Sequence, residues 1–285
     1  MIITTISELR DYLKAQRAKN KTVGLVPTMG FLHEGHLSLI RRAKAENDVV
    51  IVSDFVNPTQ FGPNEDYETY PRDIKRDTGL AVGAGADVVF YPSVTEMYPE
   101  GSATFVEVEG DITRVLCGAS RPTHFKGVTT VVNMLFNIVK PDKAYFGQKD
   151  AQQAAVLMKM VRDTHQDLEL VVCPIAREED GLAMSSRNTY LNKEERKQAT
   201  ILNQALAEGE KAFLAGETAV EKLVSIIADK INEMPLAEID YVSIYDFPSL
   251  TEIKKVEHQA LVAVAVKFGK TRLIDNRILG EAKYL

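Results

Sequence analysis

The sequence has only two cysteines, Cys117 and Cys173, among its 285 residues, which is too few for a disulfide framework. It also lacks a basic excess: 40 acidic residues against 34 basic ones give a net charge of −6, which argues against a nucleic-acid-binding surface. The apolar run at 260–266 is too short to cross a bilayer. The start of the chain becomes charged at once and shows no signal-peptide pattern. We therefore expect a cytoplasmic protein without nucleic-acid or membrane partners.

What is present is an ordinary globular composition, with 45% hydrophobic and 26% charged residues. At about 150 residues per domain, the length predicts two domains. A chain of 285 residues can bury a sizeable hydrophobic core and needs no disulfides to fold.

The first half alternates short apolar runs with amphipathic stretches. Strands are predicted at 22–26, 49–53, 87–90, 143–146 and 168–172, and helices at 7–18, 35–47, 73–84, 127–139 and 150–163. Buried strands that alternate with helices are typical of βαβ units and a parallel sheet. We therefore expect an α/β, Rossmann-like, doubly wound domain over residues 1–180.

The pattern changes after residue 188. Long helices are predicted at 193–215 and 219–234, with Thr218 as a candidate cap of the second, and strands at 239–244, 260–268 and 271–274. The short Gly269-Lys270 link indicates a hairpin. Residues 181–285 should therefore form a smaller α+β domain that closes over the site.

Four segments carry the residue types that chemistry needs, and the first is PTMGFLHEGH at 27–36. It lies where a buried strand should end and a helix should begin, the edge at which open α/β sheets bind ligands. A helix N-terminus offers unpaired N–H groups that suit phosphate. His33 and His36 are three residues apart, so both imidazoles should face one side and donate hydrogen bonds to phosphate oxygens.

A metal site is the alternative interpretation of these two histidines. Zinc proteases place two histidines four residues apart on an established helix, with a glutamate as the base. Here the spacing is three, a glycine lies inside the motif, and no third ligand follows nearby. The pattern therefore favours phosphate binding over catalytic zinc.

The second segment, FVNPTQF at 55–61, follows the next predicted strand. Asn57 and Gln60 carry amides that both donate and accept hydrogen bonds, which suits a small hydroxylated substrate. Phe55 and Phe61 could form the walls of an apolar pocket. A polar loop with buried aromatic anchors is an equally simple interpretation of this segment alone.

The third segment, YFGQKDAQQ at 145–153, is another strand-to-helix junction. Asp150 is a candidate N-cap whose carboxylate would accept from the next turn. Lys149 would reach a phosphate as a point charge, and Gln153 would face the same crevice. A solvated lysine and a capping aspartate are the alternative.

The fourth segment, REEDGLAMSSRN at 177–188, holds two hydroxyls and a guanidinium in sequence, Ser185, Ser186 and Arg187. Arginine offers a forked, permanently charged donor for phosphate, so the three residues form a candidate anion clamp. A helix N-cap would explain one serine but not the cluster.

Together these segments resemble the pantothenate synthetase (pantoate–β-alanine ligase) family, within the His-x-Gly-His nucleotidyltransferase superfamily. The matching motifs occur in family order over residues 27–188; they are PTMGFLHEGH, FVNPTQF, YPRD, RPTHFKGV, FGQKDAQQ and DGLAMSSRN. One departure is Gln148, which stands where many relatives carry glutamate.

The resemblance implies a homodimeric ligase that joins (R)-pantoate and β-alanine with ATP and Mg²⁺. In the family, pantoate attacks the α-phosphate of ATP to form a pantoyl adenylate, which β-alanine converts to pantothenate and AMP. Forming the adenylate needs positioning and stabilisation of phosphate charge, and no protein nucleophile.

The resemblance also implies roles for single residues. The implied catalytic residues are His36 (described in the family as the proton donor), His33, Lys149, Ser185, Ser186 and Arg187. ATP contacts are implied for Met29, Gly30, Phe31, Leu32, His33, Glu34, Gly35, His36, Gly147, Gln148, Lys149, Asp150, Ala176 (through its backbone), Met184, Ser185, Ser186 and Arg187. Implied contacts to the small substrates are Gln60, Gln153, Asn57, Tyr70 and Arg121. The magnesium ligands stay undetermined, because the acids at Asp73 and Asp77 do not settle them.

Two other functions use similar chemistry. An adenylyltransferase acting on a phosphate ester would need more arginine and lysine near residues 57–60, where this chain has amides and aromatics. A non-catalytic ATP-binding module would need neither the paired histidines nor Lys149.

Overall fold

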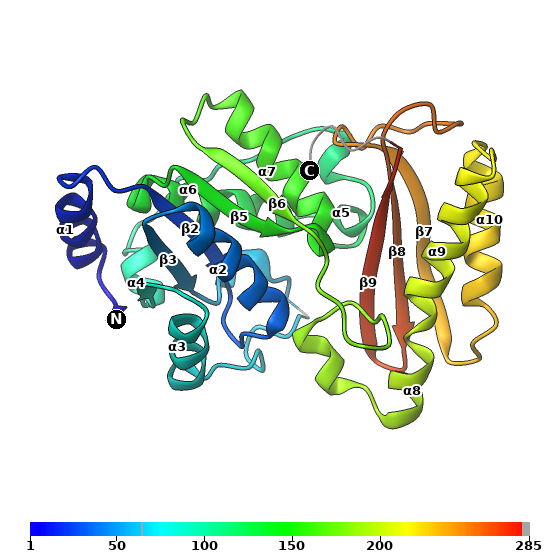
Figure 1. The fold of residues 1–285 in the computed structure, drawn as a ribbon, viewed down its shortest axis with the longest axis horizontal. Helices are drawn as coiled ribbons and strands as arrows, with labels where there is room; N and C mark the ends of the chain where they lie inside the picture. Colours follow the sequence, from blue (N-terminus) through cyan, green and yellow to red (C-terminus); the bar gives the residue numbers. More distant parts are fainter. Residues whose placement is uncertain (64, 281–285) are drawn as a thin grey trace.

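Residues 1–63 and 65–280 are described by the structure, a computed structural model of the chain. Its N-terminal part is built on a six-stranded parallel sheet with strand order β1-β4-β3-β2-β5-β6 (Figure 1). The strands are β1 (Ile2–Ile3), β2 (Val23–Thr28), β3 (Val49–Asp54), β4 (Val88–Phe90), β5 (Lys143–Gly147) and β6 (Glu169–Cys173). The central strands β2, β3 and β4 are almost entirely buried, as expected where helices cover both faces.

Helices cover the two faces of this sheet in separate layers. One layer holds α1 (Ile6–Arg17), α6 (His124–Val139) and α7 (Ala151–Asp163), and the other holds α2 (Glu34–Glu46) and α3 (Ile74–Gly83). Because side chains alternate along a strand, Leu25 of β2 packs into the first layer and its neighbour Val26 into the second. Short elements connect these parts: η1 (Pro58–Gln60), α4 (Val94–Met97), η2 (Asp111–Thr113), α5 (Cys117–Ser120), η3 (Gln148–Asp150) and η4 (Ser186–Tyr190).

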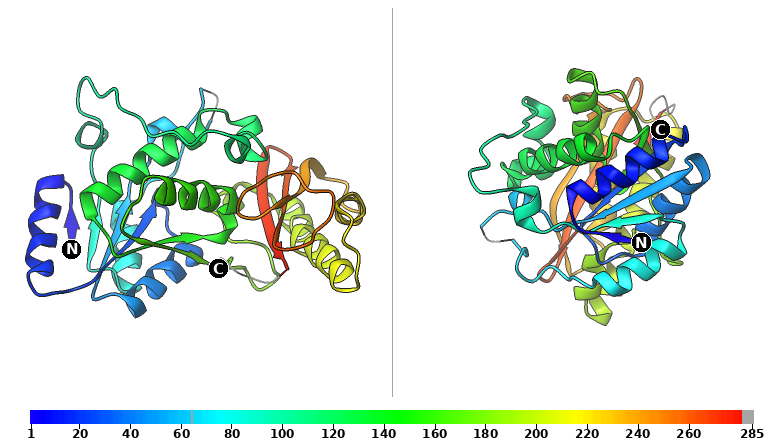
Figure 2. Two further views of the ribbon diagram at one scale, coloured as in Figure 1. Left: turned by 90° about the horizontal axis from the view of Figure 1, so that it is seen from above. Right: turned by 90° about the vertical axis from the view of Figure 1, so that its left-hand side faces the viewer.

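The C-terminal part is an antiparallel sheet of order β7-β8-β9 packed against helices. Its elements are α8 (Lys193–Gln198), α9 (Ile201–Leu214), α10 (Val220–Ile231), β7 (Ala237–Asp246), β8 (Ala260–Phe268) and β9 (Thr271–Leu279). Figures 1 and 2 show the two parts side by side, with α1 at one end of the molecule and α10 at the other. A shared apolar cluster joins them, in which Ala155 and Val156 of α7 pack with Leu261 and Ala263 of β8.

The predicted fold class, a doubly wound parallel sheet with a smaller α+β part, is confirmed. The domain boundary near residue 180 stays a prediction. The single helix predicted at 193–215 is wrong, because the chain breaks at residues 199–200 into α8 and α9. Thr218 does not cap α10; Ala219 holds that position without a side-chain cap. No helix among residues 1–63 and 65–280 is long and apolar enough to cross a membrane.

Candidate active site

All four sequence segments meet at one cavity of about 230 Å³ beyond the carboxyl ends of β2, β3 and β5. Parallel strands end at the same sheet edge, so segments far apart in the sequence come together there. The predicted site residues that line it are Met29, His33, Gly35, His36, Asn57, Gln60, Tyr70, Arg121, Gly147, Lys149, Asp150, Gln153, Ala176, Met184, Ser185, Ser186 and Arg187.

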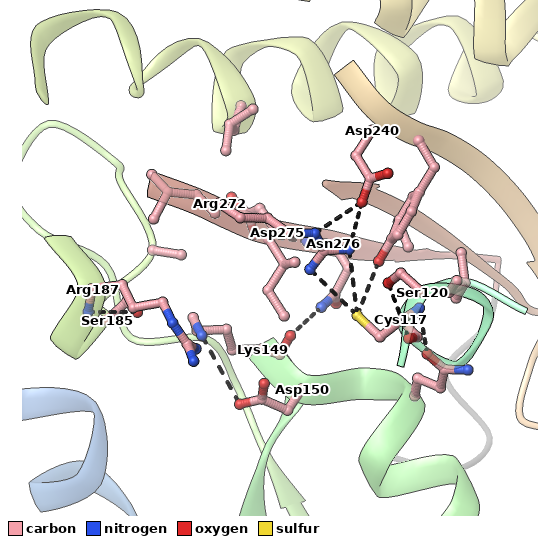
Figure 3. Close-up of a pocket in the computed structure, with 18 of the residues that line it drawn as sticks. Cys117, Ser120, Lys149, Asp150, Ser185, Arg187, Asp240, Arg272, Asp275 and Asn276 are labelled. Atoms are coloured by element: carbon pink, nitrogen blue, oxygen red, sulfur yellow. Dashed lines mark hydrogen bonds and ion pairs between the residues drawn. The ribbon is translucent and has the colours of Figure 1, made fainter. Parts of the chain in front are cut away.

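A second cavity of about 610 Å³ adjoins the first and reaches the C-terminal sheet. Lys149, Asp150, Ser185 and Arg187 line both cavities, so the charged groups lie at the passage between them. Figure 3 shows these residues on one side of the second cavity, with Asp240 and Arg272 on the other. The site is therefore bounded by both parts of the chain.

His33 and His36 begin helix α2 and cap it. His33 Nδ1 accepts a hydrogen bond from Gly35 N at 3.1 Å, and His36 Nδ1 accepts one from His33 N at 3.3 Å. The centroids of the two imidazole rings lie 4.1 Å apart. Because each Nδ1 accepts, each neutral ring carries its proton on Nε2. The capping contacts thus leave both Nε2–H groups as donors.

The surroundings keep both imidazoles uncharged at neutral pH. Burial, followed by the positive charge of Lys149, lowers the pKa of His33 to about 4. Burial, with His33 and Lys149 adding to it, holds the pKa of His36 well below its usual value. Both histidines are therefore suited to donate N–H hydrogen bonds to an anion.

The turn before these histidines is held by Asp77, a carboxylate that is 1% exposed. Asp77 of α3 accepts hydrogen bonds from Phe31 N at 2.6 Å and Leu32 N at 2.8 Å. Phe31 has a left-handed φ of 47°, a conformation that non-glycine residues rarely adopt, so the turn needs such support. Arg76 completes it by pairing with Asp77 and donating to Leu32 O. The sequence gives no signal for this contact across 45 residues.

Five residues that the resemblance assigned to ATP do not line the cavity of about 230 Å³: Gly30, Phe31, Leu32, Glu34 and Gln148. Leu32 is 1% exposed and belongs to the core, and the ring of Phe31 lies against the Arg76 guanidinium. Glu34 instead pairs with Arg41 at the surface, and the side chain of Gln148 contacts Asn276. The ATP contacts implied for these five residues therefore stay predictions.

Asp54, at the end of β3, is a buried carboxyl that the sequence did not single out. It is 4% exposed, and a Cβ on Gly30 would lie 2.4 Å from its Oδ1, so only glycine fits the facing turn. Burial raises the pKa of Asp54 to about 7, and the neighbouring Asp77 adds to the shift. A raised carboxyl pKa means that ionisation costs folding free energy.

We expect Asp54→Asn to stabilise the protein at alkaline pH. The cost of ionising Asp54 is absent below its unfolded pKa of about 4 and complete above about pH 7, so the gain should approach about 4 kcal/mol at about pH 8 and vanish at about pH 4. Urea unfolding across this range measures it. Asp163→Asn is the control: Lys159 and Arg162 lower the pKa of Asp163, so its replacement should bring no such gain. A gain that does not grow with pH would contradict the assignment.

The loop at the end of β3 presents Gln60 to the cavity. Asn57, 1% exposed, donates to Gln60 Oε1 and to Gly127 O, both at 3.1 Å, and accepts from Tyr98 OH at 2.8 Å. Gln60 Nε2 in turn lies 3.0 Å from Met29 Sδ. The amide of Asn57 is therefore committed to the protein and orients Gln60.

Lys149 and Asp150 lie on η3, directly after β5. Among the residues that the structure describes, the one ion pair of Lys149 Nζ is a long one, at 4.0 Å, to the Asp150 carboxylate, so its ammonium is available to a ligand. Asp150 occupies the N-cap position of α7, but the capping hydrogen bond predicted from the sequence is absent. The intervening turn of η3 sets the backbone so that this carboxylate lines the cavity.

The serine-arginine segment, residues 185–187, begins with a helix cap and continues with the candidate anion-binding residues. Ser185 is the N-cap of η4 and accepts a hydrogen bond from Arg187 N at 3.3 Å. The N-cap interpretation of the sequence therefore explains this one serine. The Arg187 guanidinium lies 3.3 Å from Asp66, and Ala176 O accepts from Met184 N at 2.9 Å. The segment lines the cavity with Ser185, Ser186 and Arg187, and Met184 lines it too.

Arg121 is one of the residues predicted from the sequence to contact the substrates, whereas His124 is not. Arg121, predicted to line the pocket, forms two hydrogen bonds to Glu65 and contacts His124 Nε2 at 3.1 Å. His124 was not singled out, but it lies 2.9 Å from Gln60 O and lines both cavities. Burial, with Arg121 adding to it, lowers the pKa of His124 to about 4.

Comparison with known proteins matches this architecture along nearly the whole chain. The family model of pantoate-beta-alanine ligase matches residues 1–278. The chain belongs to the pantoate–β-alanine ligase family. It therefore has pantothenate synthetase activity, the ATP-dependent condensation of pantoate and β-alanine.

Relatives support the family assignment in sequence and in structure. Pantothenate synthetase of Thermotoga neapolitana is 58% identical over 279 residues, 98% of this chain and 99% of the relative. That of Acetivibrio thermocellus is 56% identical over 278 residues, 98% of this chain and 99% of the relative. The crystal structure of the Thermus thermophilus enzyme superimposes with a TM-score of 0.92 at 46% identity, covering 97% and 98% of the two chains. The Francisella tularensis ligase, described as a complex with beta-gamma ATP and beta-alanine, gives a TM-score of 0.79 at 36% identity, covering 98% and 97%.

Proposed function

We propose that this site makes pantothenate in two steps through a pantoyl adenylate, with the residue roles given below. The observation that carries the proposal is the meeting of the four segments at one cavity. ATP enters with its phosphates at the N-terminus of α2, where the Nε2–H groups of His33 and His36 donate to phosphate oxygens. Lys149, Ser185, Ser186 and Arg187 surround the same charge. The Francisella relative, named as a complex with an ATP compound and β-alanine, supports this assignment.

Pantoate binds at the opposite wall. Gln60 and Gln153 bind its hydroxyl and carboxylate oxygens, while Val128 and Val131 of α6 contact its methyl groups. Asn57 acts indirectly, by holding the amide of Gln60. Tyr70 and Arg121 line the same cavity, and we assign them to contacts with the small substrates.

The chemistry follows from these positions. A pantoate carboxylate oxygen attacks the α-phosphorus of ATP, the bond to the bridging oxygen breaks, and pyrophosphate leaves with that electron pair. The unprotonated β-alanine amine then attacks the acyl carbon of the adenylate, AMP leaves, and the amine proton passes to solvent. The protein supplies orientation and preorganised donors where negative charge develops. The low pKa values of His33 and His36 favour neutral donors over a proton-donating acid, the role that the resemblance implied for His36.

Magnesium is proposed as part of the nucleotide substrate. The described residues contain no group of three or more histidine, cysteine or acidic side chains placed to hold a metal ion. Asp73 accepts from Arg76 N, and Asp77 is committed to the turn at 31–32. Mg²⁺ would therefore be held chiefly by phosphate oxygens and water, where it would shield phosphate charge.

We also propose how the two parts of the chain divide the work and how many chains form the enzyme. Residues 1–180 bind ATP and pantoate, and residues 181–285 close over them, since the two cavities share Lys149 and Arg187. We propose a homodimer from the family resemblance alone.

Exchange of labelled pyrophosphate into ATP tests the two-step function. We expect exchange that depends on pantoate and needs no β-alanine, because only the first step is reversed. Exchange without any acid, or no exchange at all, would contradict an acyl-adenylate pathway. Exchange that instead required a phosphate ester would indicate the adenylyltransferase alternative.

A further inference from the structure

The C-terminal sheet reaches the active site through two adjacent residues of β9. Asp275 is 2% exposed and Asn276 is 3% exposed, so both polar side chains are buried. Consecutive side chains of a strand point to opposite faces, which lets these two contact different loops. Figure 3 shows both among the residues that line the second cavity, together with Lys149 and Asp150.

Asn276 holds the backbone of η3. Its Nδ2 donates to the carbonyl oxygens of Gln148 and Lys149, each at 2.9 Å. Its Oδ1 accepts from Gln148 Nε2 at 3.2 Å. The buried Asn276 amide thus donates both of its N–H hydrogens to two consecutive peptide carbonyls of the turn that carries Lys149.

Asp275 holds the second loop in the same way. It accepts from both terminal nitrogens of Arg177, at 2.7 and 3.0 Å. Arg177 Nη1 also donates to Gly181 O at 3.1 Å, and Arg177 bridges to Ala183 across the hairpin that leads to the serine-arginine segment. Both loops with charged active-site groups are therefore tied to one point of β9.

Lys149 depends on such support because its own side chain is weakly held. Within residues 1–63 and 65–280, its ammonium makes only the 4.0 Å pair with Asp150, and η3 lacks a side-chain cap. A lysine on a flexible four-carbon stem stabilises transferred charge only as well as its backbone is placed. The contact that fixes this backbone comes from a residue 127 positions away, in the other part of the molecule.

We propose that Asn276 is a positioning residue for adenylation, which fixes the Lys149 turn against the C-terminal sheet so that the phosphate site is complete only when both parts are docked. This inference rests on the charge-stabilising role proposed for Lys149. Asn276 lines the second cavity and not the cavity of about 230 Å³, and its effect passes through the backbone of η3.

The experiment is pantoate-dependent pyrophosphate exchange by Asn276→Ala in the full chain. We expect the maximal rate per folded molecule to fall roughly 10- to 100-fold, since two hydrogen bonds that place the turn are lost. The KM for pantoate should stay within about twofold, because Gln60 and its supports are untouched and Gln153 belongs to α7, outside the turn that Asn276 contacts. If the alanine variant does not fold, Asn276→Ser is used, since a hydroxyl has one proton and cannot donate to both carbonyls.

A double variant separates positioning from a merely structural role. If Asn276 acts through Lys149, then Asn276→Ala adds no further loss to Lys149→Ala. Gln198→Ala is the matched control: Gln198 is a buried amide of the C-terminal part, 8% exposed, and accepts from Leu236 N at 3.0 Å, away from both loops. We expect it to lower the melting temperature and leave the exchange rate of folded enzyme unchanged.

Each other outcome counts against the inference. A wild-type maximal rate in Asn276→Ala, or losses that multiply in the double variant, would overturn it while leaving the two-step function intact. Full exchange by Lys149→Ala would remove both this inference and the proposed role of the lysine. If the wild-type enzyme shows no pantoate-dependent pyrophosphate exchange, the proposed function itself is wrong.

Discussion

Lys149→Ala should lower pantoate-dependent pyrophosphate exchange by about 10²- to 10³-fold without unfolding the protein. Removing one preorganised group that faces developing phosphate charge has a cost of this size. The fold should survive because, in the part of the chain that the structure describes, Lys149 Nζ makes only the 4.0 Å ion pair with Asp150. Initial rates at saturating ATP and pantoate, together with circular dichroism, measure both parts of the expectation.

Lys143→Ala is the matched control for this prediction. Lys143 lies at the opposite end of the same strand, β5, where it pairs with Glu46 and Glu169 outside the cavity. Its loss removes a lysine of equal charge from the same element, so exchange should stay within about twofold of wild type. Equal losses in the two variants would mean that net charge or stability, and not the position of Lys149, governs the rate.

The parts of the fold that were predictable from sequence are those with local signals. The five strands of the parallel sheet predicted in the first half are short apolar runs between amphipathic stretches, and the structure places a strand at each of them. β1 was missed because its two residues are too few to show a period, although Ile2 and Ile3 pair with β4. The break between α8 and α9 was missed because residues 199–200, Ala-Thr, carry no glycine or proline to mark it.

In the candidate site too, residues with a local sequence signal could be predicted and residues without one could not. Motif residues such as His33, His36 and Lys149 could be found because each follows a predicted strand, and the ends of parallel strands share one edge. Their supports could not, since Asp77 and Asn276 each form two hydrogen bonds with the backbone of a turn that lies far away in the sequence, 45 positions from Asp77 to Leu32 and 127 from Asn276 to Lys149. Side chains that hold a loop from another element have no characteristic spacing, so only the structure identifies them.

Gly127 packs against the loop that carries Gln60. Gly127, in the first turns of α6, lies so close to this loop that a Cβ would be 2.4 Å from Thr59 O and 2.6 Å from Gln60 Cα. Both atoms are backbone, so the loop itself must move in Gly127→Ala. A displacement of about 1 Å at a substrate-positioning residue can cost about 10²-fold, and we expect a loss of that order in kcat/KM for pantoate. The KM for ATP should change little, because the histidines of α2 are not involved.

Gly79→Ala provides the comparison that isolates this effect. Gly79 is also inside a helix, α3, and a Cβ there would meet nothing within 4 Å. Because alanine favours helix by about 1 kcal/mol over glycine, this variant should be as stable as wild type or more so, with unchanged kinetics. Gly127→Ala gains the same helix propensity but should lose about 1–3 kcal/mol to overpacking, which urea unfolding measures. Wild-type kcat/KM for pantoate in Gly127→Ala would show that the loop accommodates the methyl group, and that Gln60 is not held by this contact.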